Sequence, residues 1–432
     1  MGSRSQIGVG LMGLGVVGTS VARTLLAKGD YFARRVGLPL VLRRALVRNP
    51  DKRRQLEIDA SLLTADADDI LRDEGVDIVV EVMGGEVPAY DYLKEALAGA
   101  RYVVTANKEV MAKHGPELLP LAHSNGVDVL YEASVGGGTP IIAPLRRDLL
   151  ANDIAGIRAI INGTTNYILT RMGREGLEFA PALHQAQALG YAEADPSNDV
   201  DGTDAAYKLA ILASLAFQAW VQPADVYREG IARVNARDFR YAGELGYAIK
   251  LLALARRQGD AIQARVHPVL LPMDEPLAKV DGVLNAVQVE GDLLGRALFQ
   301  GPGAGPLPTA SAVVADIVDA ARRIASGADG GLPWHPQAPA RVQPMSHLLS
   351  RFYLRMEVPD RPGVLAQIAS VLGQNQISIA SVIQKETNES AQTAEIVIMT
   401  HTASEGAMQE ALRQMTRLEA VREIGNFLRV ED

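Results

Sequence analysis

The sequence contains no cysteine among its 432 residues. This absence excludes a disulfide framework and every metal site that is built on thiolate ligands. Only seven histidines are scattered along the chain, so we do not expect a histidine-rich site for a transition metal.

The chain also lacks long apolar runs and a surplus of basic residues. No stretch of about 18 apolar residues is free of charge, which predicts no transmembrane helix, and the first residues lack the apolar core of a signal peptide. The net charge of −8 gives no basic footprint for nucleic acid or an anionic membrane. We therefore expect a cytoplasmic enzyme of two or three domains, without nucleic-acid or membrane partners.

Strand and helix patterns alternate over the first part of the chain. This alternation predicts an α/β fold with a Rossmann-like, doubly wound parallel sheet over residues 1–140. The apolar runs that predict buried strands are 7–11, 40–47, 76–82, 102–105 and 127–131, and the helical patterns cover 16–26 and 91–97.

Residues 141–305 mix the two periods and predict an α+β substrate and dimerisation domain. Strands are expected at 154–161, 263–269 and 283–289, and helices at 165–172, 180–189 and 204–215. A further helical pattern over 309–321 follows the Gly-Pro-rich break at Gly301–Pro306. We expect the chain to rejoin the first domain there, over about 306–328.

The segment 329–348 is rich in Gly, Pro and Ala and predicts a linker. Residues 349–432 then predict a ferredoxin-like βαββαβ module. Its strands are expected at 352–358, 378–384, 393–400 and 421–428, and its helices at 363–372 and 405–415.

A glycine-rich turn separates the first strand from the first helix. It reads Gly13-Leu14-Gly15-Val16-Val17-Gly18. In this pattern the first glycine permits the turn, the second lets the backbone approach a pyrophosphate, and the third lets helix and strand pack closely. The pattern predicts a dinucleotide site at the helix N-terminus, and a glycine turn without a ligand is the alternative.

Three further strand ends carry candidate cofactor residues. Arg48 follows the second strand where an NAD enzyme would place a carboxylate, so it favours the 2′-phosphate of NADP, with a solvated basic loop as the alternative. Met83 and Gly84 follow the third strand, and Thr105 with Lys108 follows the fourth. Carboxyl ends of parallel strands share one edge, where such sheets bind ligands.

The densest polar segment runs from Gly190 to Lys208. Its carboxylates suit a substrate that carries an ammonium group. Asp204 and Lys208 are four residues apart and therefore neighbours on one helical face. A lysine at the rim of an apolar site can exchange protons with a substrate. A solvated acidic loop with an ordinary helix salt bridge is the alternative.

These segments together resemble the homoserine dehydrogenases, and the resemblance covers essentially the whole chain. It rests on GLGVVG, VRN, EVMGG, TANK, YEASVGGGTP, NGTTNY, GYAEADPSNDVDGTDAAYK and GPGAGPLPTASAV. The C-terminal module, with Asp360-Arg361-Pro362-Gly363-Val364-Leu365 at its first turn, resembles an ACT regulatory domain. The resemblance implies NAD(P)-dependent interconversion of L-homoserine and L-aspartate 4-semialdehyde, a step toward threonine, methionine and isoleucine.

The resemblance also implies roles for individual residues. Lys208, Lys108 and Asp204 match the catalytic positions, and either lysine matches a residue described as the proton donor. Glu193, Asp199, Tyr191, Gly163 and Thr164 match the homoserine site, and Gly303 with Gly305 matches a loop near the cofactor. A monovalent cation, Na⁺ or K⁺, is implied at Glu132, Val135, Gly137 and Thr139, with mainly backbone oxygens as ligands.

Two other functions compete with this interpretation. Another Rossmann oxidoreductase would share the glycine turn but lack the GYAEADP…K segment. A non-catalytic sensor would not need the pair formed by Asp204 and Lys208. Arg48 favours NADP and leaves NAD open. The resemblance implies a homodimer or homotetramer and makes threonine the expected effector of the C-terminal module.

Overall fold

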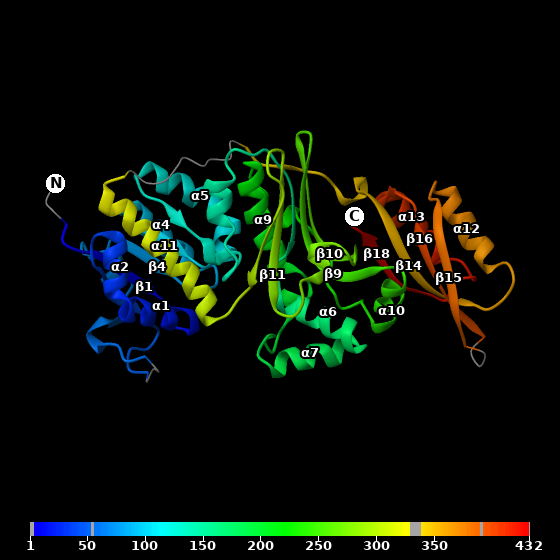
Figure 1. Cartoon of the computed structure of the whole chain (residues 1–432), viewed down its shortest axis with the longest axis horizontal. Helices are drawn as coiled ribbons and strands as arrows, with labels where there is room; N and C mark the ends of the chain where they lie inside the picture. Colours follow the sequence, from blue (N-terminus) through cyan, green and yellow to red (C-terminus); the bar gives the residue numbers. More distant parts are fainter. Residues whose placement is uncertain (1–3, 53–55, 329–337, 389–391, 432) are drawn as a thin grey trace. The chain divides into compact units, whose positions relative to one another are not determined.

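The computed structural model describes residues 4–52, 56–328, 338–388 and 392–431 (Figure 1). The chain forms two compact units, each assembled from segments that are distant in sequence. Unit 1 contains residues 1–155, 207–224 and 285–340. Unit 2 contains residues 156–206, 225–284 and 341–432. No helix among the described residues is both long and apolar enough to cross a membrane.

Unit 1 is built on a parallel sheet with the strand order β3-β2-β1-β4-β5-β6. This order, with the first strand in the middle, is that of a Rossmann fold and confirms the predicted class. Strand β1 is buried along its whole length, as expected for a parallel strand covered on both faces. The strands are β1 (Ile7–Met12), β2 (Leu40–Leu46), β3 (Leu63–Thr64), β4 (Ile78–Glu81), β5 (Tyr102–Thr105) and β6 (Val129–Leu130).

The helices of unit 1 include one that returns from far along the chain. Helix α11 (Pro306–Ser326), drawn in yellow in Figure 1, packs against α1 and α2. The other helices are α1 (Val16–Ala27), α2 (Gly29–Val36), α3 (Asp68–Leu71), α4 (Ala89–Ala98), α5 (Lys108–Ser124) and most of α9 (Thr203–Phe217). Unit 1 also contains nearly all of the neighbouring strands β11 (Leu284–Gly291) and β12 (Gly295–Pro302).

Unit 2 contains a mixed sheet in the order β7-β9-β10-β18-β14-β16-β15. Its strands are β7 (Ile154–Ile160), β8 (Tyr227–Arg228), β9 (Tyr247–Gln258), β10 (Ala261–Pro272), β13 (Arg341–Val342), β14 (Leu349–Pro359), β15 (Ile379–Asn388), β16 (Thr393–Thr400), β17 (Ala403–Ser404) and β18 (Glu423–Val430). Its helices are α6 (Gly163–Glu175), α7 (Phe179–Ala188), α8 (Ser197–Val200), α10 (Ala236–Glu244), α12 (Val364–Gln374), α13 (Glu405–Met415) and the first turn of α9.

The C-terminal module has the predicted order β14-α12-β15-β16-α13-β18, with the short β17 added before α13. Apolar side chains such as Leu354, Ile368, Ile398 and Met408 form its buried core. Strand β18 also pairs in parallel with β10, so the sheet continues from the module into the preceding part of unit 2. Part of the predicted linker, residues 329–337, lies outside the described residues.

Candidate active site

The glycine-rich turn in unit 1 has the geometry of a phosphate-binding loop. Gly13 follows β1 with a φ of +101°, and Gly15 precedes the first turn of α1. A Cβ at Gly18 would lie 2.0 Å from the carbonyl oxygen of Gly13, so only glycine fits there. A Cβ at Gly15 would meet no described heavy atom within 4 Å. Gly15 therefore borders open space at a helix N-terminus, which fits a pyrophosphate.

The flanking residues of this turn differ in exposure. Val16 is 69% exposed, although it begins α1, while Leu14 and Val17 are half-buried. Arg48 is exposed on the loop that follows β2. Exposure leaves this guanidinium accessible to an anionic ligand at the expected end of the second strand.

Glu81 organises the carboxyl edge of the sheet, although no sequence pattern predicted a role for it. It ends β4, is fully buried, and one carboxylate oxygen accepts bonds from the backbone N–H groups of Met83 at 2.7 Å and Gly84 at 3.1 Å. The other oxygen accepts a 2.6 Å bond from the Thr105 hydroxyl. One carboxylate thus holds together three predicted cofactor residues from two strand ends.

Asn107 places Lys108 at the start of α5. Its side chain accepts the N–H of Val110 at 3.1 Å as the N-cap and donates to the carbonyl of Gly85 at 2.6 Å. Lys108 is the first residue of the helix and is half-buried. Lys113, farther along α5, forms hydrogen bonds to Glu109 and then Glu86, and these bonds raise its pKa.

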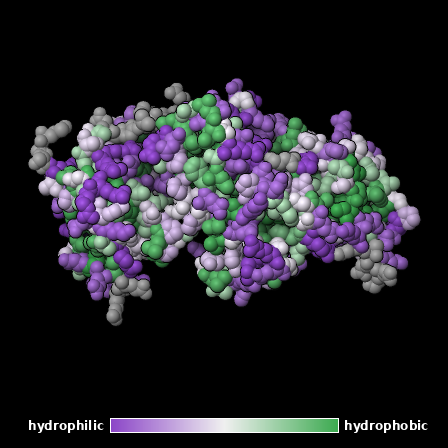
Figure 2. Space-filling view, in the orientation of Figure 1, coloured by the Kyte–Doolittle hydropathy of each residue, from purple (hydrophilic) through white to green (hydrophobic). Residues whose placement is uncertain are grey.

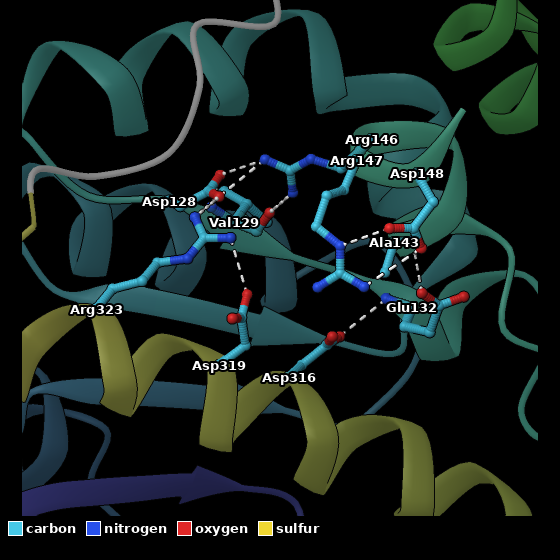
Figure 3. A network of polar contacts seen from close by, with 10 residues as sticks. All are labelled: Asp128, Val129, Glu132, Ala143, Arg146, Arg147, Asp148, Asp316, Asp319 and Arg323. Atoms are coloured by element: carbon cyan, nitrogen blue, oxygen red, sulfur yellow. Dashed lines mark hydrogen bonds and ion pairs between the residues drawn. The ribbon is translucent and has the colours of Figure 1, made fainter. Parts of the chain in front are cut away.

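The loop predicted to hold a monovalent cation, residues 132–139, is hydrogen-bonded to α11 (Figure 3). The Glu132 carboxylate accepts bonds from the backbone N–H groups of residues 141–143 at 2.6–2.9 Å. The Glu132 N–H donates to Asp316 at 2.9 Å, and burial raises the pKa of Asp316 well above its usual value. The buried Thr139 hydroxyl in the same loop has no hydrogen-bond partner among the described residues.

The same loop contacts the second glycine-rich segment of unit 1. The N–H of Gly137 donates to the carbonyl of Gly303 at 3.0 Å. Val135, Gly137 and Thr139 are all buried, and Gly305 ends the segment with a φ of +132° directly before α11. Among the described residues, no group of three or more histidine and carboxylate side chains could hold a metal ion.

Asn162 is the centre of the carboxylate cluster in unit 2, although no sequence pattern predicted a role of its own for it. Its Nδ2 donates to Asp199 at 2.7 Å and to Asp204 at 3.0 Å. Its Oδ1 accepts the N–H of Thr165 at 2.9 Å and caps α6. Asp204 is only 4% exposed, whereas Asp199 is half-buried. One amide therefore fixes two of the predicted site carboxylates.

The remaining residues predicted for the substrate lie close to this cluster in sequence. The Thr164 hydroxyl donates to the carbonyl of Tyr191 at 2.6 Å, and a Cβ at Gly163 would lie 3.0 Å from the carbonyl of Val283. The Tyr191 side chain is 44% exposed. Glu193 is exposed as well, so its carboxylate is accessible to a ligand.

Lys208 follows Asp204 by one turn of α9. The two side chains therefore share one face of that helix, and Lys208 is half-buried. Asp204 belongs to the first turn of α9 in unit 2, and Lys208 belongs to its continuation in unit 1.

Comparisons with known proteins decide which family contains this combination. The model of the homoserine dehydrogenase NAD-binding domain matches residues 13–132, that of homoserine dehydrogenase matches 140–318, and that of the ACT domain matches 352–420. Homoserine dehydrogenases from Neisseria gonorrhoeae and Synechocystis sp. are 42% and 45% identical, over 98% of this chain and 98% and 99% of theirs. The chain belongs to the homoserine dehydrogenase family.

Solved structures of the family agree with this assignment. A homoserine dehydrogenase from Thiobacillus denitrificans matches with a TM-score of 0.93 and 43% identity, over 99% of this chain and 98% of that one. A hyperthermophilic archaeal homoserine dehydrogenase in complex with NADPH matches with a TM-score of 0.61 and 29% identity, over 73% and 97%. The protein is therefore an NAD(P)-dependent oxidoreductase with the activity of this family, and its C-terminal module is an ACT domain.

Proposed function

We propose that Glu193 and Asp199 bind the ammonium group of L-homoserine and that Lys208 accepts the proton of its hydroxyl during oxidation to L-aspartate 4-semialdehyde. The observation that carries this proposal is the bonding of Asn162 to both Asp199 and Asp204. It keeps Asp199 oriented without neutralising it, and it fixes the buried carboxylate one helical turn before Lys208.

The nicotinamide cofactor supplies the hydride acceptor for this reaction. The protein's part is to bind and orient. Gly13, Gly15 and Gly18 shape the turn for the pyrophosphate, with Leu14, Val16 and Val17 completing it. Met83, Gly84, Thr105, Gly303 and Gly305 are proposed as further cofactor contacts. Lys108 begins α5 at the carboxyl edge of the sheet, so it is the second candidate for proton transfer.

We propose that the enzyme prefers NADP over NAD because Arg48 binds the 2′-phosphate of NADP. The exposed guanidinium on the loop after β2 supports this role, and one relative of known structure is a complex with NADPH. A charge-assisted bidentate contact contributes roughly 1.5–3 kcal/mol, which corresponds to about 10- to 150-fold in affinity.

The test is a side-by-side assay of NADP⁺ and NAD⁺ with homoserine for Arg48→Ala. The KM for NADP⁺ should rise by roughly that factor, while the KM for NAD⁺ stays within about twofold. Arg34→Ala, which removes an exposed guanidinium from α2, is the matched control and should change neither value. Equal losses for both cofactors in Arg48→Ala would show that Arg48 does not contact the 2′-phosphate.

A monovalent cation, Na⁺ or K⁺, is proposed at the backbone oxygens of Glu132, Val135, Gly137 and Thr139. The buried and unpartnered Thr139 hydroxyl supports it. Thermal melts in NaCl, KCl and tetramethylammonium chloride should show stabilisation by one small cation, and Thr139→Val should reduce that difference. Equal melting temperatures in the three salts would remove the cation from the proposal.

Threonine is proposed as the effector of the ACT domain in a cytoplasmic homodimer or homotetramer. The outer surface of this domain supports pairing with a second copy. Leu365 on α12 and Val382 on β15 are exposed apolar residues, and a green area covers this part of Figure 2. Strand β15 ends the described sheet of unit 2. Light scattering measures the mass of the parent and of Val382→Lys, each with and without threonine, and so tests both proposals. A parent protein that is monomeric and whose mass does not change with threonine would refute them.

A further inference from the structure

A buried arginine of the ACT domain joins that domain to the part of unit 2 that carries the substrate residues. Arg429 lies on β18 and is 1% exposed. It donates to Glu405 at 2.8 and 2.6 Å and to Glu229 at 2.8 and 2.9 Å. Glu405 begins α13 of the ACT domain, whereas Glu229 directly follows β8 in the substrate part. The guanidinium therefore connects two carboxylates from different modules of one unit.

The segment that Glu229 begins is packed against the loop that carries Asp199. The N–H of Ile231 donates to the carbonyl of Val200 at 3.0 Å. A Cβ at Gly230 would lie 2.4 Å from the same carbonyl oxygen and 2.9 Å from the Cα of Asp201. The two backbones are thus too close for any side chain, and a shift of one has to move the other.

The opposite side of this contact is not filled by protein. Gly230, Asp201, Glu229 and Glu405 all line a cleft of about 1630 Å³ within unit 2. Packing from that side therefore does not fix the position of Glu229 and Gly230, whereas the Ile231 side chain is fully buried. The restraints on Glu229 include the bond from its N–H to the carbonyl of Val266 at 2.8 Å, the bond that its carboxylate accepts from the Tyr227 hydroxyl, and the ion pair with Arg429.

We infer that Arg429 is a positioning residue for the homoserine site: it holds Glu229, and through the backbone of 229–231 it sets the place of Val200 and the neighbouring Asp199. The inference rests on the proposed role of Asp199 in substrate binding. A displacement of α13 would move Glu405, and Arg429 would have to follow or leave a buried charge poorly paired. A displacement of α13 in the ACT domain would therefore change the affinity of the site for homoserine.

The test uses the full-length enzyme and two conservative variants, Glu229→Gln and Glu405→Gln. Each removes one charge at Arg429 but leaves the other carboxylate as its partner. We expect the KM for homoserine to rise by at least about fivefold in both, the lower end of typical coupling between sites, while the KM for NADP⁺ changes by less than twofold. Arg429→Lys, which keeps the charge but loses the fork geometry, should give a smaller rise.

Glu395→Gln is the matched control, because Glu395 is also a buried ACT carboxylate that joins the same two modules. It pairs with Arg355 at 2.9 Å and with Arg237 at 3.1 Å. The melting temperature of Glu395→Gln should fall at least as much as those of the two test variants, while its KM for homoserine stays unchanged. If Glu229→Gln and Glu405→Gln also lower only the melting temperature, Arg429 is merely structural and the inference is wrong.

Asp199→Asn distinguishes this failure from a failure of the proposed function. A raised homoserine KM in Asp199→Asn, together with unchanged values in the two test variants, overturns only the role of Arg429. An unchanged KM in Asp199→Asn overturns the assignment of Asp199 and, with it, the inference.

Discussion

Replacing Asn162 by aspartate should make the stability of the protein and its affinity for homoserine fall as the pH rises. The substitution keeps an oxygen that accepts the N–H of Thr165, so the cap of α6 remains. It replaces the amide donor by an oxygen that faces Asp199 at 2.7 Å and Asp204 at 3.0 Å. Three carboxyl groups then share one site.

The expected magnitude follows from Coulomb's law. Two unit charges about 3 Å apart repel by roughly 5 kcal/mol at an effective dielectric constant of 20. The cluster avoids part of this cost by binding a proton, so the pKa of one carboxyl group rises in the folded state. If the rise is about two to three units, at 1.36 kcal/mol per unit, the variant loses roughly 3–4 kcal/mol of stability between about pH 4 and pH 7.

The protonated form of the cluster is the more stable one in the folded state, so the stability of the variant decreases as the pH rises. A group whose pKa is raised by folding contributes no penalty below its unfolded pKa, and the full penalty is present above its folded pKa. The protonated carboxyl can also donate to one neighbour, as the amide did. The homoserine KM of Asn162→Asp should therefore be near the parent value at low pH and increase at high pH.

Thermal melts and homoserine kinetics at pH 5 and pH 8 would measure both effects. Asn162→Ala is the comparison, because it loses the cap and the donor but adds no titratable group, so its penalty should vary less with pH. A melting temperature of Asn162→Asp that follows the parent across this range would show that the three groups do not interact as the structure has them.

Three further outcomes follow from single features of the structure. Lys208→Ala should lower turnover by roughly 10²–10⁴ with the melting temperature unchanged; near-normal turnover would refute its role and leave proton transfer to Lys108 or to water. Gly15→Ala should fold normally but raise the KM for the cofactor, whereas Gly18→Ala should lower the melting temperature, and the reverse pattern would contradict the proposed turn. A chain that ends near Ser350 should fail to fold, since the fully buried Asp238 would lose the partners that it has in the ACT domain; a stable, active fragment would refute this.

Much of the fold could be predicted because local patterns determine it. Short apolar runs and the glycine turn indicated the Rossmann sheet. Helices α12 and α13 of the ACT domain lie close to the predicted ranges 363–372 and 405–415. Helix α5 was missed because Pro116 and Pro120 lie inside it, where proline usually ends a helix. Strand β9 was missed because Tyr247–Gln258 combines a continuous apolar run with a charged end, which periodicity does not distinguish from a helix.

The site was predictable only as far as residue types point to ligands. Carboxylates and lysines in a loop before a helix suggest a substrate, so Asp199, Asp204 and Lys208 could be predicted as candidates. Asn162 and Glu81 were not predicted, because the two carboxylates that Asn162 contacts are 37 and 42 positions away and the Thr105 contact of Glu81 is 24 positions away. A residue that orients other residues shows nothing of this in its own sequence neighbourhood.

The C-terminal module shows the same limit on a larger scale. The pattern predicted a last strand over 421–428, which leaves out Arg429, and charged residues are usually exposed. The strand instead continues to Val430, and Arg429 is buried because Glu229 and Glu405 pair with it. The two residues added to the strand are also those that pair with Val269 and Leu270 of β10. A sequence that indicates a separable module after a linker therefore folds as the continuation of the sheet of unit 2. One of the two residues that join them, Arg429, is a residue that a hydrophobic pattern assigns to solvent.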